Sequence, residues 1–299
     1  MPQKKKEQRW SVEKRLEFID FRLFWEGQIN RSDIMDQFDV SVPQASNDLS
    51  KYQEAAPKNL HYDFKVKKYF STDSFKPAFI TPDADSYFRQ LRDDMLALKS
   101  NPAPWLSYEP EYDIVQMPKR NIDPDILRVV SESIKEQKTL KVLYQSMNGE
   151  EPVWREISPH AFAFDGMRWH TRAFCHKDYD YKDFLLSRIQ ETGDFVNDEW
   201  PTQPDEKWNT YFTLSLTTHP DLTKSQAKAV ALDYDMTEGR LDLNIRLALL
   251  YYYLRRFGLY PSCDGSEMPA NEQHVVVANK AATKKALAKA QTIKKKEAA

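Results

Sequence analysis

The sequence has little of what marks secreted, disulfide-stabilised or membrane-spanning proteins. Only two cysteines occur in 299 residues, and Cys175 and Cys263 have neither metal-ligand nor disulfide-framework spacing, which fits a reducing compartment. No apolar run reaches the ~18 residues of a membrane span, and the lysine-rich start lacks the apolar segment of a signal peptide. We therefore expect a cytoplasmic protein with no membrane partner.

Catalytic signatures are missing as well. The sequence has no glycine-rich phosphate loop, no Gly-x-Ser-x-Gly elbow and no His-Glu-x-x-His zinc pair. His176 beside Cys175 is too little for a metal site, and Asp178, Asp180 and Asp183 fit a hydrated turn better than a Mg²⁺ cluster. We expect no enzyme, no metal and no cofactor. Because the formal net charge is only −2, any nucleic-acid surface must be local.

Three short helices are predicted at the start of the chain. Ser11 can cap the first, which Gly27 ends, and the second follows over residues 30–38. Ser41 can cap the third, with Gln44 in capping-box spacing, and this helix runs to about residue 52. Two short helices joined by a tight turn describe a helix-turn-helix. The basic arm before the first helix (Lys4, Lys5, Lys6 and Arg9) is expected to be a solvated terminus.

The third helix carries polar side chains suited to DNA, since amides pair with adenine edges and lysines reach phosphates. Residues 60–63 and 65–71 read as a basic hairpin, which is typical of the wing of a winged helix. The predicted DNA-binding residues are Pro43, Gln44, Ser46, Asn47 and Lys51 on the helix and Lys65, Lys67 and Lys68 on the hairpin. The plainer alternative is a three-helix bundle with a hydrated polar face.

The centre of the chain contains four short runs rich in β-branched and aromatic residues, at 140–146, 153–164, 168–175 and 182–189. Asn148-Gly149 and Asp165-Gly166 separate two pairs of them, and such dipeptides favour tight hairpin turns. A meander this short must curl to hide its apolar face, which favours a small SH3-like or Sm-like barrel. A helix over residues 123–135 is expected to pack against it.

Polar residues inside these strands suggest a binding site. Arginines and histidines at several strand positions could hold an anion, because guanidinium forks suit phosphate and carboxylate oxygens. The alternative is a solvated outer face that forms salt bridges with nearby acidic residues. Arg155 and His160 have opposite strand parity, so both reach one pocket only if the strand bends at Pro159.

Four motifs in this region resemble the WYL domain of bacterial transcriptional regulators. They are Tyr144-x-Ser146, Arg155-x-Ile157-Ser158-Pro159-His160, Trp169-His170-Thr171-Arg172-Ala173 and Phe184-Leu185-Leu186-Ser187-Arg188-Ile189. The tripeptide that names the family reads Trp169-His170-Thr171 here. The resemblance implies a sensor domain for an anionic effector, a nucleotide or nucleic acid. It also implies a pocket lined by Tyr144, Ser146, Arg155, His160, His170, Arg172 and Arg188.

The rest of the chain predicts connecting and C-terminal elements. A helix over 83–98 carries an apolar stripe that needs a partner. Strands at 211–216 and 240–245 and helices at 223–232 and 247–257 indicate a small α+β domain. The Tyr251-Tyr252-Tyr253 run fits either that domain's own core or a dimer interface. The last twenty residues, rich in alanine and lysine, are expected to be a frayed helix or disordered tail.

Together these features predict a multidomain α+β protein. We assign residues 1–75 to a winged helix-turn-helix, 76–122 to a helical linker, 123–195 to the WYL domain, 196–280 to an α+β dimerisation domain and 281–299 to a tail. The whole pattern resembles the BrxR/CapW-type regulators of phage-defence systems. That resemblance implies a homodimeric, nucleoid-associated repressor bound to an inverted repeat in double-stranded DNA. The alternative is a nucleic-acid-processing enzyme that uses the winged helix for docking.

Overall fold

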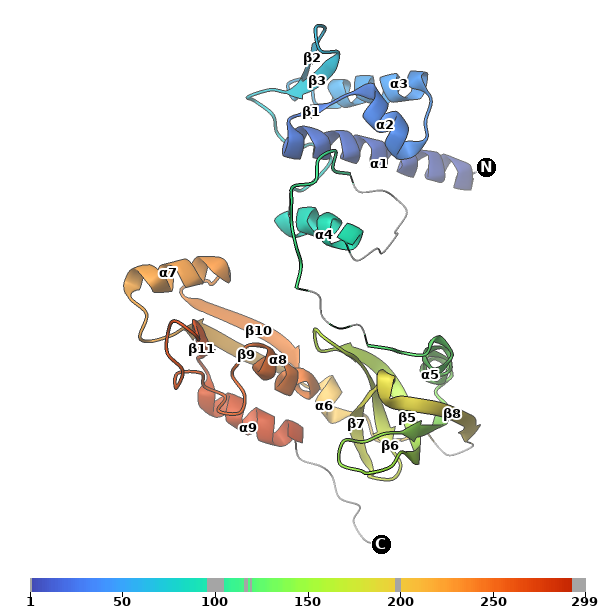
Figure 1. Ribbon diagram of the computed structural model, residues 1–299, viewed down its shortest axis with the longest axis vertical. Coiled ribbons are helices and arrows are strands. Elements are labelled where there is room, and N and C mark those ends of the chain that lie inside the picture. The colour runs from blue at the N-terminus through green and yellow to red at the C-terminus, as the bar shows by residue number, and fades with distance from the viewer. Residues whose placement is uncertain (1, 96–104, 116–117, 119, 197–199, 292–299) are drawn as a thin grey trace. The chain divides into compact units, whose positions relative to one another are not determined.

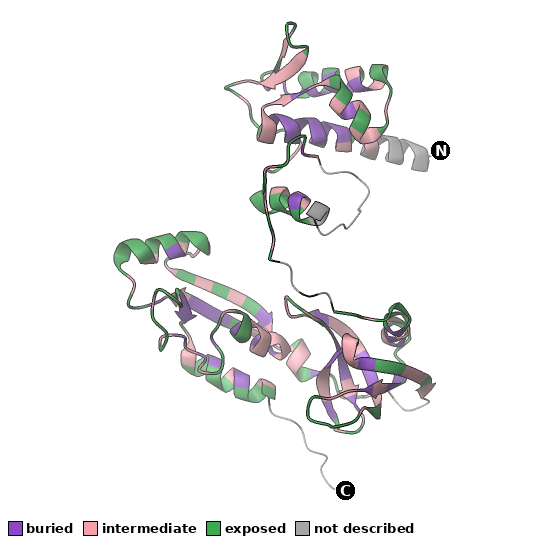
Figure 2. Ribbon diagram, in the orientation of Figure 1, coloured by how far each residue is buried: buried purple, intermediate pink, exposed green. Residues whose placement is uncertain are grey.

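The computed structural model describes residues 2–95, 105–115, 118, 120–196 and 200–291, and for 2–10 and 93–95 it describes the backbone alone. The chain forms two compact units, Met1–Gln116 and Met117–Ala299 (Figure 1). Each unit has its own buried core (Figure 2). Among the described residues, no helix is both long enough and apolar enough to cross a membrane.

The N-terminal unit is a winged helix-turn-helix. Its elements in order are α1 (Pro2–Glu26), β1 (Gln28–Ile29), α2 (Arg31–Phe38), α3 (Val42–Ala55), β2 (Leu60–Asp63), β3 (Lys68–Ser71) and α4 (Ala84–Met95). Strands β2 and β3 form the predicted hairpin, and β1 pairs with the other edge of β3, which gives the order β1-β3-β2. The predicted cap of α3 is confirmed, since Ser41 accepts from Gln44 N (3.4 Å). Helix α2 is capped by Asn30, which accepts from Asp33 N (3.0 Å).

The predicted start of the first helix at Ser11 is wrong. Helix α1 already begins at Pro2, so Lys4–Lys6 and Arg9 lie within the helix and not in an arm before it. The physical reason is that Gln, Lys, Glu and Arg are all good helix formers, and no glycine or proline lies between Pro2 and Gly27. Ser11 therefore lies in the interior of the helix.

Helix α4 finds its partner within the same unit. Leu91 of α4 packs with Phe21 of α1 and Leu106, and Trp25 and Tyr87 lie against this cluster. The apolar stripe predicted for this helix therefore covers α1. The predicted end of the helix at Leu98 falls outside the described residues.

The WYL part of the second unit is a five-stranded antiparallel sheet covered by one helix. Its elements are α5 (Pro124–Glu136), β4 (Thr139–Tyr144), β5 (Val153–Phe164), β6 (Trp169–Cys175), β7 (Asp180–Leu185), the 3₁₀ turn η1 (Leu186–Arg188) and β8 (Ile189–Val196). The strand order is β7-β6-β5-β4-β8. Ile126 and Val130 of α5 join the core of the sheet, as predicted. Strand β8 was missed because its polar residues lack an apolar alternation.

The C-terminal part is a small α+β fold. Its elements are α6 (Glu206–Asn209), β9 (Tyr211–Thr218), α7 (Lys224–Asp233), β10 (Arg240–Arg246), η2 (Leu247–Leu249), α8 (Leu250–Arg256), β11 (Val275–Val277) and α9 (Lys280–Gln291). The sheet order is β10-β9-β11. The expectation of a frayed or disordered tail is wrong for residues 280–291, because Thr283 and Leu287 of α9 are buried and Leu287 lies in the core. Residues 292–299 are outside the described part.

Candidate nucleic-acid interface and effector site

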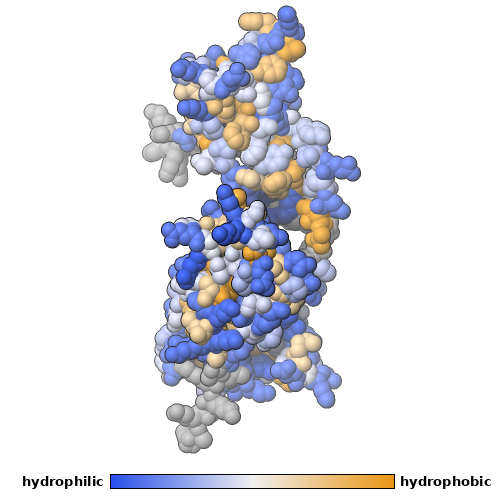
Figure 3. Space-filling view, turned by 90° about the vertical axis from the view of Figure 1, so that its left-hand side faces the viewer, coloured by the Kyte–Doolittle hydropathy of each residue, from blue (hydrophilic) through white to orange (hydrophobic). Residues whose placement is uncertain are grey.

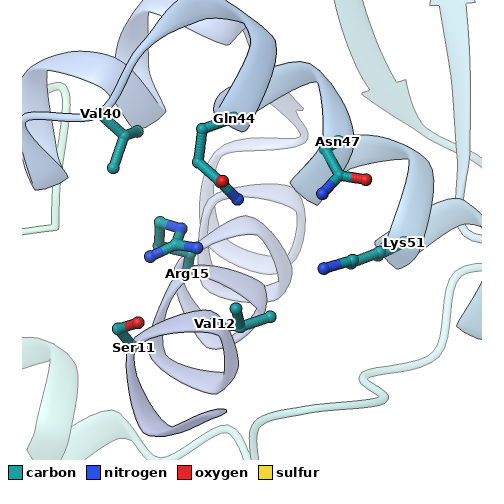
Figure 4. A pocket seen from close by; sticks show the side chains of 7 residues that line it. All are labelled: Ser11, Val12, Arg15, Val40, Gln44, Asn47 and Lys51. Carbon is teal, nitrogen blue, oxygen red and sulfur yellow. The ribbon is translucent and has the colours of Figure 1, made fainter. Parts of the chain in front are cut away.

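A polar groove runs between α1 and α3 in the N-terminal unit (Figure 4). Three side chains of α3, Gln44, Asn47 and Lys51, project toward the α1 side of this groove. The groove has a volume of about 540 Å³, and the remaining lining residues are Ser11, Val12, Arg15 and Val40. The helical spacing of the three α3 residues places them along one stripe of the helix.

The predicted residues of α3 differ in how free they are. Asn47 and Lys51 are exposed, as is Pro43. The Gln44 amide instead donates to Asp48 Oδ1 (3.0 Å), and Asp48 is buried in an ion pair with Arg15 (2.5 Å). Ser46 donates to the carbonyl of Val42 within the helix (2.8 Å). Asn47 is therefore the better placed of the two amides to meet a base edge, since Gln44 would first have to leave Asp48.

The predicted lysines of the wing lie at and beside its turn. Lys65 and Lys67 are exposed in the turn between β2 and β3, and Lys68 is half-buried with its ammonium group 3.3 Å from Gln28 Oε1. Cations held on a projecting hairpin suit phosphate contacts, which position a protein on DNA without reading sequence.

On the WYL sheet, Arg172 and His160 meet on one carboxylate, Asp205. Arg172 donates from Nε to Oδ2 (2.6 Å) and from Nη2 to Oδ1 (3.2 Å), and His160 Nε2 lies 3.2 Å from Oδ2. Arg172 Nη1 also donates to Asp183 (3.1 Å). Burial alone would raise the pKa of Asp205, but hydrogen bonds from His160 and Arg172 outweigh it and hold this pKa well below the ordinary value. We call these three side chains the Asp205 clasp.

His170 lies beside the clasp in a second acidic setting. Its Nε2 is 3.0 Å from Asp165 Oδ2, and its ring packs against Tyr252 of α8 with centroids 4.9 Å apart. Burial would raise the pKa of Asp165, but hydrogen bonds led by that from His170 lower it to about 2. Tyr252 also donates to Asp183 (2.9 Å), so the tyrosine-rich helix covers the WYL sheet as well as its own core.

The other predicted effector residues lie in two further places. Arg155 pairs with Asp178 (3.0 Å) and does not share a carboxylate with His160, although the ladder between β5 and β6 shifts register between Pro159 and Ala161. Tyr144 is buried in the core of the sheet, and its hydroxyl accepts from Leu185 N (3.3 Å). The backbones of β4 and η1 meet where Tyr144 pairs with Ile189 and Gln145 N donates to the Arg188 carbonyl (3.1 Å). Ser146 and Arg188 are half-buried at this end of β4. Within the described ranges the Arg188 guanidinium makes no ion pair.

Exposure decides between the two interpretations of the basic face. His170 is 3% exposed and Arg172 is 4% exposed, so this structure shows neither an open anion pocket nor a solvated outer face there. The acidic partners were missed, namely Asp183 and Asp205 for Arg172 and Asp165 for His170. Asp205 could have been found as an N-cap, since it precedes the short helix α6 and accepts from Trp208 N (3.1 Å). Among the described residues, no cluster of three or more potential metal ligands occurs.

Family models match three segments of the chain. Residues 11–93 match the BrxR transcriptional regulator winged helix-turn-helix domain, 125–192 the WYL domain and 211–283 the BrxR C-terminal dimerization domain. A solved structure, proteasome accessory factor B/C of Arthrobacter aurescens, matches 88% of this chain and 46% of its own at a TM-score of 0.23 and 14% identity, a likeness on which no argument rests.

Curated relatives match nearly the whole chain. A DNA-binding transcriptional repressor CapW of Stenotrophomonas maltophilia is 41% identical over 91% of this chain and 90% of its own. CapW repressors of Escherichia coli (strain KTE188) and Pseudomonas aeruginosa are 40% and 39% identical, each over 84% of both chains. The relatives are repressors and not enzymes, which sets aside the alternative of a nucleic-acid-processing enzyme. The chain therefore belongs to the BrxR/CapW family of WYL-domain transcriptional regulators, with a winged helix-turn-helix, a WYL domain and a C-terminal dimerization domain.

Proposed function

We propose that this protein is a homodimeric transcriptional repressor that binds an inverted repeat in double-stranded DNA and controls a phage-defence operon in the cytoplasm. The observation that carries the proposal is identity of about 40% with CapW repressors over most of both chains. The exposed Asn47 and Lys51 on α3 and the exposed Lys65 and Lys67 of the wing in the same unit support it. The domain boundaries expected from the sequence are part of this proposal, except that α9 (Lys280–Gln291) belongs to the C-terminal fold.

A gel shift tests the proposal directly. The purified chain is mixed with the DNA immediately upstream of its own gene at roughly physiological salt, with unrelated DNA of equal length as competitor. A discrete complex that survives the competitor supports a sequence-specific repressor. Smearing that disappears with salt would mean that the lysines alone hold DNA, and the proposal would fail.

Asn47→Ala and Lys65→Ala are expected to act differently on this complex. Loss of the Asn47 amide should cost about 1 to 3 kcal/mol on the specific site and relax sequence preference there. Loss of the Lys65 charge should weaken binding to specific and random DNA similarly. It should also reduce the slope of log affinity against log salt concentration by about one unit. Titrations of specific and random duplexes at several salt concentrations measure both. If both variants weaken binding to specific and to random DNA equally, α3 is not the recognition helix.

We further propose that the WYL domain takes an anionic nucleotide or nucleic-acid effector through the predicted residues, first at the half-buried Ser146 and Arg188. The buried Tyr144 and Arg172, and His160 beside Arg172 on Asp205, would be reached only after a rearrangement. Arg155 and His170 complete the predicted set. Because Arg172 is 4% exposed, an effector that reaches it has to displace Asp205. The clasp joins the WYL sheet to the segment leading into the C-terminal fold, so displacement would alter how these two parts are joined.

Arg188→Ala is the variant of choice for this effector site, because Arg188 is half-buried and unpaired within the described ranges, so its removal leaves no buried carboxylate without a partner. We expect the variant to bind operator as the wild type does but to resist release by a short single-stranded oligodeoxynucleotide. Operator release monitored by fluorescence anisotropy measures this. Arg128→Ala, an exposed arginine of α5, is the control and should respond normally. Normal release from Arg188→Ala would remove this residue from the site.

A further inference from the structure

The tip of the wing combines charge with exposed apolar surface. The turn between β2 and β3 (residues 64–67) contains Phe64, which is 83% exposed, and Val66, which is 53% exposed. Lys65 and Lys67 alternate with them, and Lys68 follows. The hairpin projects from the body of the N-terminal unit (Figure 1), and apolar and hydrophilic atoms lie next to each other at that end of the unit (Figure 3). Phosphate contacts alone would need only the lysines.

The turn is built to hold Phe64 outward. The Asp63 carboxylate accepts from Lys65 N (2.7 Å) and Val66 N (3.4 Å), which fixes the backbone on either side of the apex. The Phe64 ring stands edge-on to Tyr62, with centroids 4.9 Å apart, and Tyr62 packs on Tyr69 across the hairpin at 4.7 Å. The ring is thus supported from below while its outer surface stays open to solvent. A preorganised aromatic loses little conformational entropy when it is buried by a partner.

We propose that Phe64 is an apolar wedge that enters the DNA minor groove beside the site read by α3, with Val66 against the sugar wall. This inference rests on the proposed function. The flanking lysines select a polyanion as the partner, and DNA offers an aromatic ring two apolar surfaces, the deoxyribose walls and the face of an unstacked base step. Side chains such as Phe and Leu act in this way in minor-groove proteins, where they kink the duplex.

The wedge and the lysines contribute in ways that experiment separates. Burial of Phe64 displaces no counterions, whereas each lysine–phosphate contact does. Phe64→Ala should therefore lower affinity for the operator by about ten- to a hundredfold, which corresponds to about 1.4 to 2.8 kcal/mol, at every salt concentration and leave the salt slope unchanged. Lys65→Ala should instead reduce the dependence of affinity on salt concentration. Phe64→Leu should retain most of the affinity, and Phe64→Ser should not.

Phe88→Ala provides a matched control. Phe88 of α4 is 63% exposed in the same unit and stands edge-on to Tyr87 with centroids 5.6 Å apart, so its setting resembles that of Phe64 without the lysines. Affinity is measured by anisotropy titration on the upstream DNA, and bending by the mobility of circularly permuted fragments. We expect Phe88→Ala to match the wild type in both and Phe64→Ala to lose affinity and bend.

Three results would contradict the proposed function or the proposed wedge. If the wild type forms no specific complex, the proposed function fails. If the wild type binds specifically and Phe64→Ala binds and bends DNA equally well, only the wedge is overturned. If Phe64→Ala changes the sedimentation of the free protein but not its DNA binding, the exposed ring covers another protein surface and the wedge is again overturned.

Discussion

Replacing Asp20 with alanine is expected to lower the free energy of unfolding of the N-terminal unit by about 3 to 5 kcal/mol and to abolish DNA binding at moderate temperature. Asp20 is fully buried in α1. Its Oδ2 accepts from the backbone amides of Ala78 (2.8 Å), Phe79 (2.8 Å) and Ile80 (3.0 Å), and its Oδ1 accepts from the Tyr52 hydroxyl. The alanine variant leaves all these donors without an acceptor.

The measurement is urea unfolding of the full chain, followed by tryptophan fluorescence, to which Trp25 and Trp105 of the N-terminal unit contribute. Asp73→Ala is the control, because Asp73 is exposed in the loop after β3, and surface substitutions of this kind stay within about 0.5 kcal/mol. A loss below about 1 kcal/mol for Asp20→Ala would show that water or a local shift satisfies the freed amides.

Arg172→Ala should destabilise the second unit by a similar amount, about 3 to 5 kcal/mol, because it removes the cation that pairs with the buried Asp205 carboxylate and with the half-buried Asp183. For that reason it cannot serve as a clean test of effector binding. The double variant Arg172→Ala with Asp205→Asn should recover part of the loss, since it removes one stranded charge but keeps an acceptor for Trp208 N. Unfolding of all three proteins in urea checks this order. A double variant with a lower free energy of unfolding than Arg172→Ala alone would contradict this order.

The stability of the second unit should depend on pH through the carboxyls of Asp205 and Asp165. The pKa of Asp205 is lowered in the folded state, chiefly because hydrogen bonds from His160 and Arg172 outweigh burial, and the pKa of Asp165 is lowered to about 2. A carboxyl with a depressed folded pKa contributes its full stability above its unfolded pKa of about 3.9 and loses it as the pH falls further. The wild type should therefore lose stability below about pH 4, and Arg172→Ala should lose less over the same range.

Local chemistry made much of the fold predictable from sequence. Four helices begin at a residue whose side chain accepts a hydrogen bond from the first turn, namely Asn30, Ser41, Asp123 and Thr223. Such capping residues indicate the start of a helix to within a few positions. The hairpins of the WYL sheet follow from turn dipeptides in the same way. Strand β8 and helix α9 were missed or underrated because their apolar residues are few and their partners lie far away in the chain.

The candidate effector site was only half predictable. Strand parity correctly places His170 and Arg172 on one face, yet it cannot say what covers that face. The cover comes from Asp205, 33 residues after Arg172, and from Tyr252, 69 residues after Asp183. Pairing across such separations depends on how the C-terminal fold docks on the sheet, and no local pattern encodes it.

The anchoring of the linker on α1 sets where the proposed dimer can adapt to its operator. Residues 78–80 are held by Asp20, Ser107 N and Oγ donate to Glu26, and the Tyr112 hydroxyl donates to the Leu91 carbonyl (2.6 Å). These contacts hold residues 78–80, Ser107 and Tyr112 against α1 and α4 of the N-terminal unit. We expect insertions just beyond Tyr112 to change which half-site spacings the proposed dimer tolerates, whereas insertions at residues 78–80 should destabilise the N-terminal unit because they break the hydrogen bonds to Asp20.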